Sequence, residues 1–109
     1  MKRVIIESPY AGDVRRNTSY ARKCVRHSLL RGEAPLASHL LYTQPQIFND
    51  SVPEEREAGI SAGLSWYEVA ELCVVYADYG ITEGMKAAMN YAIAHNVRVE
   101  IRYILKRNT

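Results

Sequence analysis

The sequence predicts an α/β protein: a flavodoxin-like three-layer sandwich with a four-stranded, mainly parallel sheet in the order 2-1-3-4. First, four short apolar runs alternate with three longer segments in which apolar residues recur at helical spacing. Second, in the segment Val74–Met85 a β-branched run ends at Asp78, and a Gly turn leads into a capped helix. Third, the last run alternates apolar and polar residues, which is typical of an edge strand.

The first third of the chain predicts one strand and one helix. Val4–Glu7 reads as a short buried strand, and Ser8–Gly12 holds the turn-forming residues of a strand-to-helix loop. A helix over Val14–Leu30 follows, with Asp13 as its N-cap and Gly32 suited to the left-handed conformation at its end. Its inner stripe is predicted to be Ala21, Cys24, Val25, Ser28 and Leu29.

The middle of the chain predicts a second, weaker strand and a second helix. The strand covers Ala34–Tyr42, although it contains the polar residues Ser38 and His39. Ser51–Glu54 has the form of a capping box, which predicts a helix from there to about Glu71. The inner face of this helix is predicted to be Ile60, Gly63, Leu64 and Tyr67, with Gly59 and Gly63 allowing close packing.

The last third predicts a central strand, a helix and an edge strand. Leu72–Ala77 is almost entirely apolar and is therefore expected at the centre of the sheet. Thr82 caps a helix that runs to about His95, with Asn96 at its C-terminus and Val97–Tyr103 as the edge strand. The inner stripe of the helix is predicted to be Met85, Ala88, Met89, Ala92 and Ile93.

Composition predicts one domain covering residues 1–109, with outer helices that favour a homo-oligomer. The net charge of +2 is too small to indicate a nucleic-acid partner. The basic cluster within Arg15–Arg26 reads as the solvated face of a helix, or alternatively as a source of one or two arginines for a phosphate or carboxylate.

The cysteines and histidines predict no metal site and no cofactor. Cys24 and Cys73 are far apart in apolar patterns, so buried, reduced thiols are expected. The histidines lie on three different elements. No apolar run approaches the roughly 20 residues that cross a bilayer, and Met1-Lys2-Arg3 leads directly into a strand rather than an apolar leader. The protein is therefore expected to be cytoplasmic, without a membrane partner.

Polar side chains collect after the strands, at the edge where open parallel sheets bind ligands. Two helix N-termini, which attract anions, are expected at the same crevice. The predicted catalytic carboxylates are Asp78, Glu83 and Glu7. The predicted ligand-binding residues are Ser8, Tyr10, Arg16, Asn17, Tyr20, His39, Gly80, Thr82, Met85 and Ala88.

Most of these residues also have a purely structural interpretation. Glu7 is either paired with an arginine or kept for function, and Asp78 has the same two readings. Glu83 fits a surface residue favoured by the helix dipole. His39 fits a hydrogen-bonded structural histidine as well as a base. A ligand contact and a capping role are both open for Asn17 and Tyr20.

Several common chemistries are disfavoured by the motifs. Ser8 does not lie in a nucleophile elbow and has no evident triad partners. The phosphate-loop and dinucleotide fingerprints are absent, which disfavours simple nucleoside triphosphate hydrolysis and nicotinamide hydride transfer.

Two segments resemble the nucleoside 2-deoxyribosyltransferase-like superfamily. Ile6–Gly12, followed by Arg16-Asn17, is similar to its opening strand and small-Pro-Tyr turn. Gly80–Met85, followed by Ala88 and Ala92, is similar to its second motif. The resemblance is closest to an uncharacterised branch of bacteria and their phages, on Gly32–Pro35, Ser38–Tyr42 and Glu54–Arg56.

The resemblance implies a flavodoxin-like fold, oligomers, and transfer or hydrolysis of N-glycosidic bonds in nucleosides or nucleotides. The nucleophile implied by the family is a Glu four residues before Ala92, and that position is Ala88. Ala cannot form a glycosyl-enzyme intermediate. Either the chain is a non-catalytic relative, or another carboxylate acts, or Ala88 is an engineered replacement of a Glu.

Three hypotheses follow. The first is a nucleoside- or nucleotide-type ligand site, with N-glycosidic bond cleavage if the chain is catalytic. The second is a non-catalytic protein that captures a nucleotide signal, for instance in phage–host conflict. The third is a structural interaction module that pairs through the edge strand Val97–Tyr103.

Overall fold

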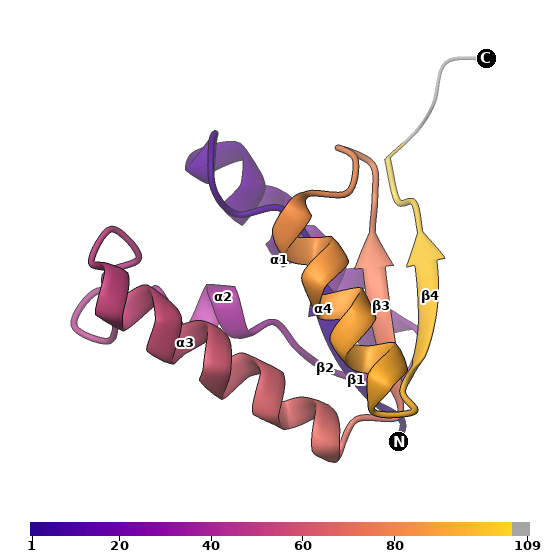
Figure 1. Ribbon diagram of the computed structural model, residues 1–109. Helices are drawn as coiled ribbons and strands as arrows, with labels where there is room; N and C mark the ends of the chain where they lie inside the picture. The colour runs from indigo at the N-terminus through magenta and orange to yellow at the C-terminus, as the bar shows by residue number, and fades with distance from the viewer. Residues whose placement is uncertain (106–109) are drawn as a thin grey trace.

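The computed structural model describes residues 1–105 and confirms the predicted fold class. Four parallel strands form one sheet in the order β2-β1-β3-β4 (Figure 1). The strands are β1 (Arg3–Glu7), β2 (Ala34–Leu36), β3 (Leu72–Tyr76) and β4 (Arg98–Arg102). Because all strands run in the same direction, their carboxyl ends meet at one edge of the sheet.

Helices cover both faces of the sheet. They are α1 (Val14–Leu30), α2 (Ser38–Tyr42), α3 (Pro53–Ser65) with the 3-10 turn η1 (Trp66–Glu68), and α4 (Glu83–Ala94). In Figure 1, α1 lies behind the sheet, and α3 and α4 lie in front. Two core clusters reflect this division: one packs Tyr20 and Cys24 of α1 on the sheet, and the other packs Tyr67, Met85 and Ala92 on the opposite face.

The helix α1 has the predicted ends. The Asp13 carboxylate accepts a hydrogen bond from the Arg16 amide at 3.1 Å, and Gly32 has a φ of +80° just after the helix. The predicted inner stripe is wrong at Leu29, which is 55% exposed. Ser28 takes the buried place in that turn because its hydroxyl donates a hydrogen bond to the Glu33 carboxylate at 2.7 Å.

The predicted second strand is too long. β2 ends at Leu36, and Ser38–Tyr42 forms the short helix α2. The Thr43 hydroxyl donates a hydrogen bond to the His39 carbonyl and so caps the turn. His39 therefore lies on a helix, at the carboxyl edge of the sheet, and not within a strand.

The start and end of α3 also differ from the prediction. Ser51–Glu54 forms no capping box: Val52 is the N-cap, Pro53 occupies the first turn, and no side chain caps the helix. The helix stops at Ser65 instead of about Glu71, whose carboxylate accepts a hydrogen bond from the Arg3 amide at 2.7 Å.

Two residues assigned to inner helix faces are exposed. Ile60 is 47% exposed because α3 packs chiefly on the short helix α2 (Figure 1), and it reaches the core cluster of the sheet only near its end, at Leu64. Ile93 of α4 is 62% exposed, and Ala92 is the buried residue of that turn. Gly63 is buried, as predicted.

Gly63 allows the close approach of α3 to α2. A Cβ at this position would lie 2.5 Å from Ser38 Oγ and 3.0 Å from Ser38 Cβ. We expect Gly63→Ala to lower the free energy of unfolding by about 1–3 kcal/mol, because the added methyl overpacks the contact. In the control, Gly59→Ala, the nearest atom is 3.6 Å away, and denaturant unfolding should show unchanged or slightly raised stability. A Gly63→Ala variant as stable as the parent would contradict this packing.

The last third follows the prediction closely. β3 is fully buried at the centre of the sheet. The Thr82 hydroxyl accepts a hydrogen bond from the Met85 amide at 3.2 Å and caps α4, and Asn96 follows the helix with a φ of +61°. Cys24 and Cys73 are buried free thiols, as expected.

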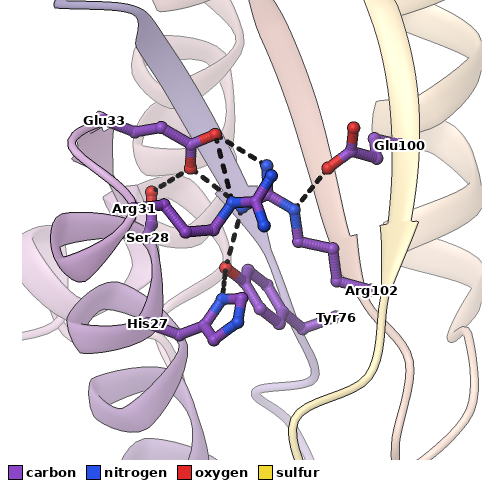
Figure 2. Close-up of polar contacts among 7 residues, drawn as sticks. All are labelled: His27, Ser28, Arg31, Glu33, Tyr76, Glu100 and Arg102. Carbon is purple, nitrogen blue, oxygen red and sulfur yellow. Dashed lines mark hydrogen bonds and ion pairs between the residues drawn. The ribbon is translucent and has the colours of Figure 1, made fainter.

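A buried ion pair ties the two edges of the sheet together (Figure 2). The guanidinium of Arg102, at the end of β4, donates two hydrogen bonds to the Glu33 carboxylate at 2.8 and 2.7 Å. Its Nη1 also donates to the Tyr76 hydroxyl at 3.2 Å, and its Nε pairs with Glu100. The Arg102 hydrogen bonds lower the pKa of Glu33 to about 2, so this carboxylate is ionised at neutral pH.

Within residues 1–105, no helix is long and apolar enough to cross a membrane. The same part of the chain contains no cluster of three or more His, Cys, Asp or Glu residues with the geometry to hold a metal ion.

Candidate functional site

A cleft of about 470 Å³ opens at the carboxyl end of β1, between α3 and α4. Its volume falls in the range of about 300–1,000 Å³ typical of small-molecule sites. The lining comes from five separate parts of the chain: the end of β1 and its loop, α2, the loop before α3, α3 itself, and the first turns of α4. The cleft contains seven of the residues predicted from the sequence: Glu7, Ser8, Tyr10, His39, Thr82, Glu83 and Ala88.

Glu7 is the largely buried carboxyl group of the cleft. Its Oε1 accepts a hydrogen bond from the Tyr67 hydroxyl at 2.7 Å, and Glu7 forms no ion pair with an arginine in the described part of the chain. Burial raises the pKa of Glu7 to about 7, although the hydrogen bond from Tyr67 opposes this shift. A carboxyl group with this pKa can both donate and accept a proton near neutral pH.

Hydrogen bonding extends from Glu7 into the core. The hydroxyl of Tyr67, which is 1% exposed, also lies 3.2 Å from the Cys73 sulfur. Tyr67 belongs to η1, so the end of α3 fixes the position of the Glu7 carboxyl group. Burial raises the pKa of Cys73 to about 12, which leaves this thiol protonated and unreactive.

The raised pKa of Glu7 predicts a pH-dependent stability. The folded state holds the proton more tightly than the unfolded state, whose Glu pKa is about 4.3. The resulting stabilisation is complete below that value and is lost as the pH rises through about 7. We expect the stability of the parent, relative to Glu7→Gln, to fall by on the order of 2 kcal/mol between about pH 5 and pH 8.

Urea unfolding at several pH values measures this effect. The control is Glu83→Gln, which removes a carboxylate of the same cleft whose side chain is 93% exposed. If the free energy of unfolding depended on pH in the same way for the parent and for Glu7→Gln, the raised pKa of Glu7 would be contradicted.

His39 and Tyr10 form the polar and aromatic wall of the cleft. His39 Nε2 lies 3.2 Å from Ser8 Oγ, and the His39 and Tyr10 rings meet edge to face at 5.9 Å. Burial lowers the pKa of His39 to about 4, so the ring is neutral at pH 7. The site therefore offers an aromatic ring, a hydroxyl and a neutral imidazole, which suit a polar, uncharged ligand.

The start of α4 forms the opposite wall. Thr82 and Glu83 lie there, and the Glu83 carboxylate pairs with Lys86 at 3.2 Å. Ala88 is five residues after Glu83, is 5% exposed, and lines the same cleft as Glu7. The Glu7 carboxyl group and Ala88, the position at which the family resemblance implies a nucleophilic Glu, thus line the same cleft.

Six of the predicted site residues do not line this cleft. Asp78 Oδ1 accepts hydrogen bonds from the Tyr20 hydroxyl at 2.6 Å and from the Ile104 amide at 2.9 Å, and its Oδ2 accepts one from the Leu105 amide at 3.1 Å. These contacts hold the segment after β4 against α1. Gly80 forms the β3–α4 turn with a φ of +88°.

The remaining three of these residues have packing or loop-fixing contacts. The Asn17 side-chain amide donates to the carbonyls of Tyr10 and Ala11 at 3.0 and 3.1 Å, and so fixes the β1–α1 loop. Arg16 donates to the Asn17 side-chain oxygen and lies 4.1 Å from the centre of the Tyr79 ring. Met85 is buried in the core beneath the cleft.

Sequence reasoning missed several lining residues. Arg56 lies in the cleft, and its Nε is 3.7 Å from the carboxylate of Asp50, which lies in the loop before α3. Asp50 and Arg56 flank Ser51–Glu54, the segment that the sequence predicts to form a capping box and that does not form one. Their place in the cleft depends on the distance between α3 and α4. The others are Ala11, Ser38, Ile60, Gly63, Leu64, Gly84 and Ala87.

Comparisons with known proteins agree with this architecture. A family model described as a domain of unknown function, DUF7768, matches residues 2–103. No match was found among curated proteins. A solved 2-deoxyribosyltransferase from the psychrotolerant bacterium Bacillus psychrosaccharolyticus is similar with a TM-score of 0.64 and 14% identity, over 93% of this chain and 72% of that one.

A second solved structure is similar to the same degree. The 2-desoxiribosyltransferase from Leishmania mexicana matches with a TM-score of 0.62 and 12% identity, over 94% of this chain and 65% of its own length. At these identities the likeness shows a shared fold, which confirms the fold expected from the resemblance. The bacterial and phage branch stays a prediction.

Proposed function

We propose that this chain, which belongs to the DUF7768 family, binds a nucleoside-type small molecule in the cleft at the end of β1 and cleaves its N-glycosidic bond. The observation that carries the proposal is Glu7, a largely buried carboxyl group with a pKa of about 7 in that cleft. The fold shared with two 2-deoxyribosyltransferases supports the nucleoside class of ligand.

The cleft chemistry supports hydrolysis more than transfer. In the proposed step, water attacks the anomeric carbon, the N-glycosidic bond breaks, and its electron pair leaves with the base. Protonated Glu7 donates its proton to the departing base nitrogen, and the water loses a proton to solvent or to a carboxylate. Ala88 has no carboxylate to trap the sugar covalently, so no glycosyl-enzyme forms at that position.

The charges around the cleft favour an uncharged nucleoside over a nucleotide. Three acidic residues, Glu7, Asp50 and Glu83, line it together with one basic residue, Arg56, which already pairs with Asp50. The Glu83 side chain also supplies negative charge at the N-terminus of α4, where a phosphate would otherwise be favoured.

Ala88 favours a second candidate function, in which the chain captures a nucleotide signal intact. The two proposals differ in outcome, because a capturing protein retains its ligand without releasing base. For both candidate functions we also propose that the chain forms a single domain, assembles into a homo-oligomer and is located in the cytoplasm.

Binding is tested with adenosine, inosine, deoxyadenosine and thymidine by isothermal titration calorimetry. We expect Tyr10→Ala to weaken binding of a bound nucleoside about tenfold or more, because base–aromatic stacking contributes about 1–3 kcal/mol. The control Trp66→Ala removes a 45% exposed aromatic residue outside the cleft and should leave the affinity unchanged. Equal affinities for the parent and Tyr10→Ala would place binding elsewhere.

A further inference from the structure

The exposed face of α1 is uniformly basic. Residues 14–31 contain six basic and no acidic residues. Four of the basic side chains are exposed and form no hydrogen bond or ion pair within residues 1–105: Arg15, Arg22, Lys23 and Arg26. Like charges at this density repel one another along a helix. The face, called the basic face below, therefore favours an acidic partner.

The segment from α3 through η1 to the start of β3 has the opposite charge. Residues 53–71 contain five acidic residues and one basic residue, Arg56, which pairs with Asp50. Glu54, Glu57 and Glu68 are exposed and form no ion pair within residues 1–105. This second surface is called the acidic face.

Exposed apolar side chains adjoin both faces in the same order along the chain. Leu29 and Leu30 follow the arginines of α1 and are 55% and 73% exposed. Trp66 and Val69 follow the glutamates of α3 and are 45% and 49% exposed. The spacings differ: at 1.5 Å per helical residue, Leu29 lies about 5 Å along the helix from Arg26, whereas Trp66 lies about 14 Å from Glu57. The two faces thus have opposite charge, and each carries exposed apolar side chains towards the carboxyl end of its segment.

We propose that the basic face of one copy binds the acidic face of a second copy. The two faces lie on opposite sides of the sheet, since α1 lies behind it and α3 in front (Figure 1). One copy can therefore use both faces at once, which gives a head-to-tail contact and a ring or open chain rather than a two-fold dimer.

A nucleic acid is the less favoured partner. Binding to phosphates would use the basic face. It would leave the acidic face, and the exposed apolar side chains beside both faces, without a partner. The net charge of +2 would also give little long-range attraction.

The test is sedimentation velocity of the whole chain over a range of concentrations at low and high salt. We expect self-association that weakens with salt, because exposed charges are screened. Arg22→Glu with Arg26→Glu cancels the net charge of the four exposed side chains of the basic face, since Arg15 and Lys23 remain. Glu54→Lys with Glu57→Lys leaves residues 53–71 with three acidic and three basic residues, which cancels the charge of the acidic face. Each double variant alone should self-associate more than about tenfold more weakly than the parent. An equimolar mixture of the two should recover one-to-one association, because the first variant keeps the acidic face and the second keeps the basic face.

Circular dichroism checks that both variants are folded. A parent that stays monomeric at every concentration would overturn the proposal, as would a mixture that associates no better than its components. Salt-sensitive binding of a DNA or RNA oligonucleotide by a monomeric parent, lost in Arg22→Glu with Arg26→Glu, would assign the basic face to nucleic acid instead.

Discussion

Replacing Glu7 with Gln is expected to lower the rate of base release from a nucleoside at least about 100-fold, the usual contribution of a general acid. The amide keeps an oxygen that can accept the Tyr67 hydrogen bond, so the cleft should keep its shape. Nucleoside affinity should change little, because the loss is confined to proton transfer in the transition state. Release of free base, followed by chromatography, measures the effect.

Glu83→Gln and Asp78→Asn are the matched controls, since sequence reasoning favours all three carboxylates. Glu83 is exposed and paired with Lys86, so Glu83→Gln should retain most of the rate. Asp78→Asn should chiefly lower stability, because Asp78 accepts hydrogen bonds from the backbone of residues 104 and 105. Full activity of Glu7→Gln together with an inactive, folded Glu83→Gln would assign the acid to Glu83.

Replacing Glu33 with Gln is expected to destabilise the protein by about 3–5 kcal/mol, the usual effect of removing one partner of a buried ion pair. The side chains of Arg102 and Glu33 are only 7% and 10% exposed, so the variant leaves a buried guanidinium with the partly exposed Glu100 as its remaining counter-ion. This is a large part of a typical stability of about 5–15 kcal/mol. Urea unfolding at neutral pH measures the loss.

Two further variants separate the charge effect from packing. Glu33→Leu with Arg102→Met should recover much of the stability, because well-packed apolar residues often replace a buried pair at no net cost. Glu100→Gln should cost less than Glu33→Gln, since the Glu100 side chain is 35% exposed and contributes only one contact to Arg102. A loss below about 1 kcal/mol in Glu33→Gln would contradict this account.

The stability from Glu33 also has a defined pH dependence. Its folded pKa of about 2 is below the unfolded value of about 4.3, so the contribution is present above the unfolded pKa. It is lost as the pH falls toward 2. This acid loss is opposite in sign to the change expected from Glu7, which destabilises the fold as the pH rises.

The sheet and its order could be predicted because the strands differ sharply from the helices in apolar pattern. β3 is buried on both faces and reads as a continuous apolar run, whereas β4 alternates. The sequence predicts a strand over Ser38–Tyr42 because its apolar residues follow an extended run, and a single helical turn is too short to show a period.

The candidate site could be predicted only in part. The edge of the sheet follows from strand direction, so the sequence predicts that Glu7 and Thr82 lie close together, and both line the cleft. The role of Asp78 depends on amides 26 and 27 residues later in the chain, and no local pattern indicates that contact. Arg56 was missed because the distance between α3 and α4 is set by tertiary packing.

The most direct test of the central claim is mass spectrometry of the protein incubated with a panel of nucleosides, nucleotides and cyclic ADP-ribose-type signals, beside Glu7→Gln and Ala88→Glu. The account predicts that the parent releases free base from a nucleoside without a sugar adduct on the protein, and that Glu7→Gln does not. Product or a sugar adduct only from Ala88→Glu would identify a missing nucleophile and contradict the role of Glu7. An intact ligand retained by every variant would show a capturing protein, and no ligand and no product at all would contradict the nucleoside site itself.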